Sequence, residues 1–360
     1  MRDSFKNILK IAFMYTATII GAGFASGQEI VQFFSGYFKG GYYGIITAGI
    51  LFAIIGGLVL DKVYRGRIRN YQEFIFPSVG WFMGWVMEIA STVFMISVFC
   101  VMMAGMGNIV EEKLGIPMIY GIVIMAVLCM IVVLTDIKGI VSLSAIVTPV
   151  MIFGIIFIGI YIILCRDTAV FNVMDVVKSS TDSWFFSAIL YVSYNSIIAI
   201  NVMCSLLPYM KTRRTGIYGG ILGGVFLCSV ALILNTAIML FAPGSLAHEL
   251  PVMEIVKKYG GVASILYTVV LWLAMFLSAA TSGYCFIGKI SSRIKINTKI
   301  IAAVICALVI PLSSMGFSKL IATIYPIFGY IGLFLIFVVL FQGLSVIISK
   351  TPGGIRRLRK

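Results

Sequence analysis

Long apolar segments recur along the whole chain and constrain its fold more than any other feature. Each is close to the roughly 20 residues with which a helix crosses a hydrocarbon core of about 30 Å. In lipid every backbone polar group needs an internal hydrogen bond, and the segments lack the alternation of a barrel strand. With 61% hydrophobic and 11% charged residues, the chain also differs from an ordinary soluble domain. We therefore expect an all-α polytopic membrane protein.

Ten membrane spans are predicted, and the basic residues orient them. If the N-terminus is cytoplasmic, 20 of the 27 Lys and Arg residues fall on inner segments, as the positive-inside rule requires. We expect a multi-pass protein of the cell membrane with both termini in the cytoplasm. The net charge of +14 then reflects topology and anionic lipid headgroups, not nucleic acid. The predicted spans lie near 8–35, 41–61, 80–108, 117–136, 140–165, 183–209, 216–242, 260–289, 299–313 and 318–348.

A single transmembrane domain is expected, with one repeat over about 8–165, a second over about 183–348 and a basic cytoplasmic tail at 349–360. The outer segment 242–259 should contain a short helix after its second proline. The seven dispersed cysteines predict neither a disulfide framework nor a metal site. No clustered His, Asp and Glu residues indicate an enzyme. Nothing in the sequence sets the oligomeric state.

The stretch "TIIGAGFASGQEI", residues 18–30, interrupts the first span. Glycine weakens a helix by about 1 kcal/mol relative to alanine, and three glycines occur here within seven residues. Gly23 and Gly27 could instead form a GxxxG contact between helices. Gln28 and Glu29 favour a break, because acidic side chains suit the first turn of a second half-helix. Broken helices of this kind form the central site of many secondary transporters.

Spans six and eight carry the other polar groups at mid-membrane. In "YVSYNSIIAINV" of span six, Tyr194, Asn195 and Ser196 offer donors and acceptors for a ligand, or hydrogen bonds between continuous helices. No glycine accompanies them. In "FLSAATSGYCF" of span eight, three hydroxyls at i, i+3 and i+4 share one helical face and suit a hard cation or helix packing. They belong to Ser278, Thr281 and Ser282.

Together these features resemble the LeuT-type fold of the amino acid–polyamine–organocation superfamily. The stretch "IIGAGFASGQEIVQFF" is similar to the opening motif of the YkvI-type membrane proteins. The resemblance implies a 5+5 inverted repeat with broken helices 1 and 6. It also implies alternating access, in which spans 1, 2, 6 and 7 move against spans 3, 4, 8 and 9.

The resemblance further implies where ligands bind. Substrate would lie against the span-one break, with backbone N–H groups on its carboxylate, and against the polar cluster of span six. Those positions are Gly21, Ala22, Gly23, Phe24, Tyr194, Asn195 and Ser196. A Na⁺ ion would lie between spans one and eight, held by the carbonyls of Ala17 and Ile20 and by Ser278, Thr281 and Ser282. Proton-coupled relatives can place a span-five lysine there, and span five here has none, which favours Na⁺.

Two intramembrane carboxylates remain. Glu29 could help form an extracellular gate, attract cations or cap the second half-helix. Glu88 of span three could titrate or bind a substrate amine, or it could lie near the cytoplasmic end and pair with an inner-loop arginine. An intramembrane carboxylate is costly and usually marks a functional pathway.

The leading hypothesis is a Na⁺-coupled symporter of an amino acid or a similar small zwitterion. A proton-coupled carrier with Glu29 or Glu88 as the titrating group is the first alternative. A ligand sensor without transport, comparable to a germinant-receptor subunit, is the second. No organic cofactor is expected. The partners expected are the small-molecule substrate and membrane lipid.

Overall fold

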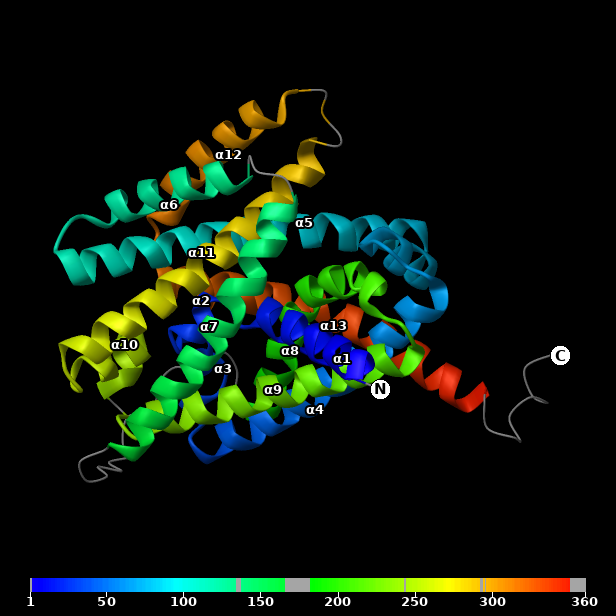
Figure 1. The fold of residues 1–360 in the computed structure, drawn as a ribbon, viewed down its shortest axis with the longest axis horizontal. Coiled ribbons are helices and arrows are strands. Elements are labelled where there is room, and N and C mark those ends of the chain that lie inside the picture. The colour runs from blue at the N-terminus through cyan, green and yellow to red at the C-terminus, as the bar shows by residue number, and fades with distance from the viewer. Residues whose placement is uncertain are drawn as a thin grey trace.

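The computed structural model describes residues 2–133, 137–165, 182–242, 244–291, 294 and 296–349, so residues 350–360 of the predicted tail lie outside it. The described chain is helical, with turns and no β-strand (Figure 1). Its α-helices are α1 (Arg2–Ile19), α2 (Ala22–Ala25), α3 (Gln28–Phe33), α4 (Lys39–Gly66), α5 (Tyr71–Leu114), α6 (Met118–Val133), α7 (Ile137–Leu164), α8 (Trp184–Ser205), α9 (Arg213–Met239), α10 (Pro251–Lys257), α11 (Gly261–Ser291), α12 (Thr298–Ser313) and α13 (Phe317–Ser349). Three short 3₁₀ turns join them, η1 (Ser35–Tyr37), η2 (Leu207–Tyr209) and η3 (Gly244–Ala247).

The helices follow the predicted spans. Seven described helices, α4, α5, α7, α8, α9, α11 and α13, are long and apolar enough to cross a membrane. The apolar helices α6 and α12 are shorter, at 16 residues each. The first span is divided among α1, α2 and α3. The expected short outer helix is α10, and Pro251 is its first residue, a position that proline favours.

Helix α5 is longer than the third predicted span because it begins in the segment between spans two and three. Asn70 caps its first turn by accepting a hydrogen bond from the N–H of Glu73 at 2.9 Å. Gly80, at φ +80°, then kinks the helix, so that its first turns lie at an angle to the membrane-spanning part. The segment between spans two and three is therefore mostly helical.

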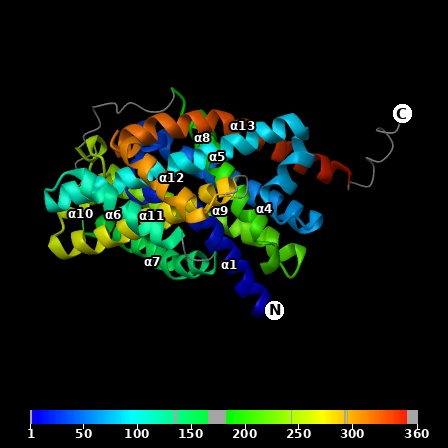
Figure 2. The same ribbon diagram turned by 90° about the horizontal axis from the view of Figure 1, so that it is seen from above.

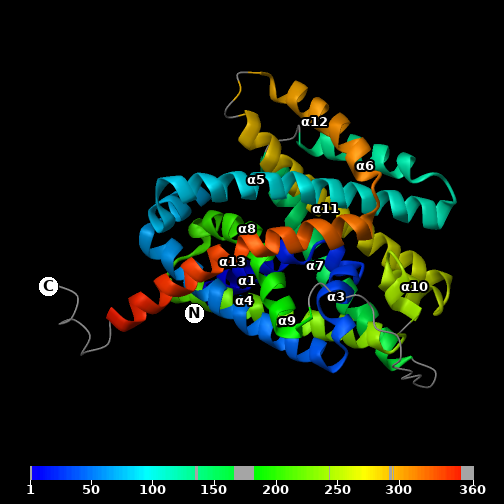
Figure 3. The same cartoon turned by 180° about the vertical axis from the view of Figure 1, so that it is seen from behind.

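Two groups of helices make up the fold. Helices α1, α4, α8 and α9 pack against one another, and α5, α6, α11 and α12 form the second group (Figures 1 and 2). Seen from behind, α13 crosses between α5 and the first group (Figure 3), and α13 contacts both α8 and α5. The two groups match the moving and static spans that the resemblance implies.

Close backbone contact joins α4 to α9. A Cβ added at Gly56 would lie 2.9 Å from the carbonyl oxygen of Gly220, which is closer than real Cβ contacts allow. Small residues at such crossings let transmembrane helices approach until their backbones touch. This contact holds together the helices that surround the broken first span.

Candidate functional site

The break in span one is present, and glycines form both of its ends. Helix α1 ends at Ile19, and Gly21 is extended, with φ −93° and ψ −169°. After the single turn of α2, Gly27 adopts φ +86°, a conformation that side chains other than glycine rarely take. A new helix, α3, starts at Gln28. The predicted break of helix 1 is confirmed.

The break removes backbone partners from carbonyl groups at the end of α1. In a continuous helix the N–H of Gly21 would donate to the carbonyl of Ala17, but here it donates to Ile19 at 2.8 Å. The N–H of Phe24, the helical partner of the Ile20 carbonyl, forms no backbone hydrogen bond to it among the described residues. The two carbonyls predicted as cation ligands, Ala17 and Ile20, are therefore among those that the break releases.

Helix α11 brings part of the hydroxyl triplet to this break. A Cβ added at Gly21 would lie 3.3 Å from Ser278 Oγ, so the hydroxyl of Ser278 lies directly against the backbone of the break. Ser282 is buried and its hydroxyl donates to the carbonyl of Ser278 at 2.6 Å, within its own helix. Thr281 is half-buried. A hydroxyl that donates in this way keeps oxygen lone pairs for a cation.

Glu29 points into the protein. Its residue is 4% exposed, and its Oε2 accepts a hydrogen bond from the hydroxyl of Tyr194 at 2.7 Å. Its Oε1 occupies the space that a Cβ on Gly23 would need. The carboxylate is therefore folded back over α2, and Gly27 at the start of α3 has no side-chain cap.

Aromatic rings surround the Glu29–Tyr194 pair. The Tyr194 ring lies 4.8 Å from Tyr325, 5.5 Å from Tyr191 and 5.5 Å from Phe33, measured between ring centroids. Phe94 of α5 is 6.0 Å away. These five residues, which we call the aromatic cluster, come from α3, α5, α8 and α13.

Only Tyr194 of the aromatic cluster was predicted from the sequence. The other four look like ordinary apolar residues of their spans, and only the fold brings them together. Phe24, the predicted wall residue, lies nearby and lines a small apolar cavity with Phe34, Phe52 and Tyr191.

Span six is not broken, which corrects the prediction for helix 6. Helix α8 is continuous from Trp184 to Ser205. Its polar side chains bond to carbonyls one turn earlier in the same helix, Asn195 to Tyr191 at 3.0 Å and Ser196 to Val192 at 2.7 Å. They add to the helical hydrogen bonds instead of replacing them, and no glycine lowers the cost of a break.

Comparisons with known proteins agree with this architecture. No family model matches the chain. It is 28% identical over 334 residues to the uncharacterized membrane protein YkvI of Bacillus subtilis (strain 168), covering 92% of this chain and 95% of that protein. It is 24% identical over 328 residues to the uncharacterized protein YyaD of the same organism, covering 91% and 94%. The expected resemblance to YkvI is confirmed along nearly the whole chain.

Solved structures decide the fold. The crystal structure of a manganese transporter of Eremococcus coleocola, in complex with an aromatic bis-isothiourea substituted compound, matches with a TM-score of 0.65 at 11% identity, over 96% of this chain and 87% of that chain. The structure of MhsT in complex with L-phenylalanine matches with a TM-score of 0.62 at 15% identity, over 91% and 87%. The chain has the LeuT-type fold.

In this LeuT-type fold, α10 covers one side of the break. The N–H of Val252 donates to the carbonyl of Ser26 at 3.1 Å, and the hydroxyl of Tyr267 in α11 donates to the carbonyl of Ala25. A Cβ added at Gly27 would lie 2.7 Å from Val252 Cγ2. The carbonyls that the second end of the break releases are thus satisfied by α10 and α11.

An ion pair closes the opposite side of the LeuT-type fold. Glu88, 2% exposed, lies 3.1 Å from the amine of Lys289 at the end of α11, and Gln72 donates to the same carboxylate at 3.5 Å. Asn201 of α8 donates to Ser91 of α5 at 3.1 Å beside it. Of the two alternatives for Glu88, pairing with a basic side chain is the one observed, but the partner is Lys289 and not an arginine of an inner loop.

The described residues contain no group of three or more His, Cys, Asp and Glu side chains arranged to hold a metal ion. Oxygen ligands are available instead at the break, from the carbonyls of Ala17 and Ile20 and the hydroxyls of α11. Whether a cation binds there stays a prediction, as do the predicted substrate contacts.

Proposed function

We propose that the protein is a secondary active transporter that carries an amino acid or a similar small amine-bearing solute together with Na⁺. The observation that carries this proposal is the position of Glu29. A carboxylate folded over a broken helix, and surrounded by aromatic rings, is suited to an organic ammonium group. The structural neighbours include transporters named for manganese and one bound to L-phenylalanine, and the aromatic cluster favours the organic solute.

The substrate amine would bind between Glu29 and the aromatic cluster. Glu29 supplies the charge, Tyr194 orients its carboxylate, and the ring faces attract a cation. The backbone N–H groups of Gly21, Ala22 and Gly23 would meet the carboxylate of a zwitterion, with Phe24 as a wall. The carboxylate of Glu29 already lies over Gly23, which is one of the positions proposed for a substrate carboxylate. Amines without a carboxylate should therefore also bind.

Na⁺ would bind where α1 ends against α11. The freed carbonyls of Ala17 and Ile20 and the hydroxyls of Ser278, Thr281 and Ser282 are hard oxygen ligands, which suit an alkali cation. Transport would proceed by movement of the α1, α4, α8, α9 group against the α5, α6, α11, α12 group. The contacts between α10 and the break would open on one side of the protein, and the Glu88–Lys289 pair would open on the other side, each in turn.

A proton-coupled carrier is the second candidate, and the same residue supports it. Glu29 is a buried carboxylate whose neighbours on the described elements include no basic side chain within ion-pairing distance. It could therefore exchange a proton instead of pairing with a substrate amine. Coupling then would not depend on the oxygen ligands between α1 and α11.

Uptake into proteoliposomes distinguishes the candidates. With an amino-acid and amine panel, we expect uptake driven by an inward Na⁺ gradient and little uptake in K⁺ buffer with a proton gradient. Ser278→Ala and Thr281→Ala should weaken the Na⁺ dependence strongly. Ser229→Ala is the matched control, because it removes an exposed hydroxyl of α9 that donates only to the carbonyl of Val225 one turn back. Equal uptake in both gradients would favour the proton-coupled carrier. Ligand binding without any flux would favour a sensor.

A further inference from the structure

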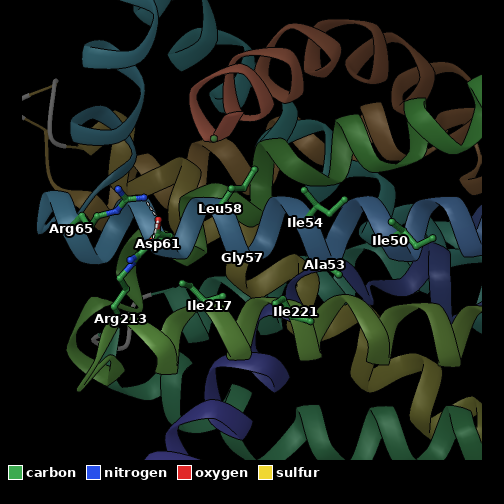
Figure 4. A pocket seen from close by; sticks show the side chains of 11 residues that line it. Ile50, Ala53, Ile54, Gly57, Leu58, Asp61, Arg65, Arg213, Ile217 and Ile221 are labelled. Carbon is green, nitrogen blue, oxygen red and sulfur yellow. Dashed lines mark hydrogen bonds and ion pairs between the residues drawn. The ribbon is translucent and has the colours of Figure 1, made fainter. Parts of the chain in front are cut away.

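A groove on the side of the protein runs between α4 and α9 and ends at a charged cluster (Figure 4). Its volume is about 480 Å³, and α13 contributes to its edge through Gly343. None of the residues that line the groove belongs to the proposed transport site, so that site does not account for the groove.

Glycine makes the groove possible. Gly56 meets Gly220 at the crossing of α4 and α9, while its neighbour Gly57 faces the groove. A Cβ added at Gly57 would lie 3.5 Å from the Ile221 side chain and 3.9 Å from that of Ile217, which are ordinary contacts. The groove is therefore open at Gly57 because no side chain fills it, and a large residue there would close it.

The walls of the groove are apolar and exposed within membrane-spanning helices. Ile50, Ile54 and Ile221 are 56%, 45% and 40% exposed. Ile50 and Ile54 are one turn apart on α4, and Ile217 and Ile221 are one turn apart on α9, so the two stripes run along the helices (Figure 4). In a membrane, such a surface is covered by acyl chains.

The charged end of the groove is positive. Arg65 and Arg213 converge on Asp61, which is 5% exposed, and one of these contacts joins Arg213 Nη2 to Asp61 Oδ2 at 3.1 Å. The side chains of Arg65 and Arg213 remain 37% and 44% exposed. Two guanidinium groups on one carboxylate leave one uncompensated positive charge, and each guanidinium has five N–H donors, more than Asp61 can accept.

We propose that this groove binds an anionic phospholipid. Its phosphate accepts hydrogen bonds from Arg65 and Arg213, and one acyl chain lies in the groove over Gly57. The positive-inside rule places both arginines at the cytoplasmic surface, where anionic lipids gather. Because the groove combines a donor-rich cationic end with an apolar channel along the membrane normal, it fits a lipid and not a soluble anion.

The occupant would bind two helices of the same moving group. Its acyl chain contacts α4 and α9 together, and its headgroup contacts one arginine from each. We therefore expect the lipid to stabilise the α4–α9 pair as a unit. This expectation is independent of the identity of the transported solute.

Thermal unfolding in lipid nanodiscs tests the proposal. Phosphatidylglycerol should raise the Tm of the protein relative to phosphatidylcholine, and native mass spectrometry should detect a retained phosphatidylglycerol molecule. Gly57→Leu should abolish both effects without changing either arginine, while Gly57→Ala, which leaves the groove open, should keep them. Arg65→Gln with Arg213→Gln should also lose the lipid, whereas Arg214→Gln, outside the groove, should not.

Several outcomes would overturn the proposal. Equal stabilisation of Gly57→Leu by phosphatidylglycerol would show that the acyl chain does not occupy the groove. Stabilisation of detergent-purified protein by inorganic phosphate alone would show that a free anion suffices. If the double arginine variant fails to fold, Gly57→Leu still decides, because it changes only the apolar part and replaces glycine by a better helix former.

Discussion

Glu29→Gln separates the two roles that a buried carboxylate can have at the break. The glutamine keeps the shape of the side chain and can still accept the 2.7 Å hydrogen bond from Tyr194, so the change removes little besides the charge. If Glu29 pairs with a substrate ammonium, the variant replaces a charge-assisted contact by a neutral one.

The expected loss follows from the burial of this site. A hydrogen bond to a charged group exceeds a neutral one by up to about 2 kcal/mol, and two unit charges about 4 Å apart gain about 4 kcal/mol at an effective dielectric constant of about 20. A loss of about 2–4 kcal/mol corresponds to a rise in Kd of about 30- to 1,000-fold. The substrate-free variant should be at least as stable as the wild type, since it no longer buries a charge.

The assay is ligand-induced thermal stabilisation, followed by uptake with any ligand found. An amine and its analogue without the amino group are compared in wild type and Glu29→Gln. Glu254→Gln is the matched control, because the side chain of Glu254 on α10 is 31% exposed. The reasoning is refuted if the variant binds the amine as tightly as wild type, or if both analogues lose the same affinity. A general loss of stability would instead indicate a structural role for Glu29.

Three further predictions concern the break and its two covers. Gly27→Ala should lower the free energy of unfolding by about 2–5 kcal/mol, because alanine is strained at φ +86° and its Cβ collides with Val252 of α10. An unchanged thermal unfolding curve would contradict this prediction. Lys289→Gln should lower the stability more than Glu88→Gln does. The first variant leaves the buried carboxylate of Glu88 unpaired, whereas the second leaves Lys289, which reaches water. Equal losses for the two variants in a double-mutant cycle would refute this difference. Lys257→Met should cost less than about 1 kcal/mol at neutral pH. The hydrogen bond from Lys257 lowers the pKa of Glu254. The stabilisation by this pair is therefore present above about pH 4.5 and disappears as the pH falls through the lowered pKa. A difference in stability between Lys257→Met and wild type that persists in acid would contradict the pairing.

The sequence alone predicts features that depend on residues close together in the chain. Apolar length fixes the spans, and three glycines before Gln28 fix the break in the first one, because both effects are local. The same argument placed the hydroxyl triplet of Ser278, Thr281 and Ser282 on one face of a helix. That span eight would lie against the break in span one followed only from the resemblance, which supplied the missing tertiary contact.

Features that depend on several helices at once could not be predicted. Phe94, Tyr191 and Tyr325 have the same character as the lipid-facing aromatics of their spans, and only the crossing of α5, α8 and α13 gathers them around Tyr194. The partner of Glu88 was missed for a similar reason. Lys289 follows the apolar part of span eight, and nothing in its neighbourhood indicates that it turns back toward span three.

The single break makes the central site asymmetric between the two halves of the fold. Span one contributes released backbone groups near Ala17 and Ile20, whereas α8 keeps its helix intact and contributes side chains, Tyr194 above all. Polar residues alone do not open α8, because Asn195 and Ser196 bond to its own carbonyls. Bending between the halves of a span should therefore occur in span one, where Gly21 and Gly27 allow it, while α8 moves as a rigid rod. The substitution Ser193→Gly would test the rigidity of α8. It adds backbone flexibility where α8 packs against Gly332 of α13, and it introduces no new side chain.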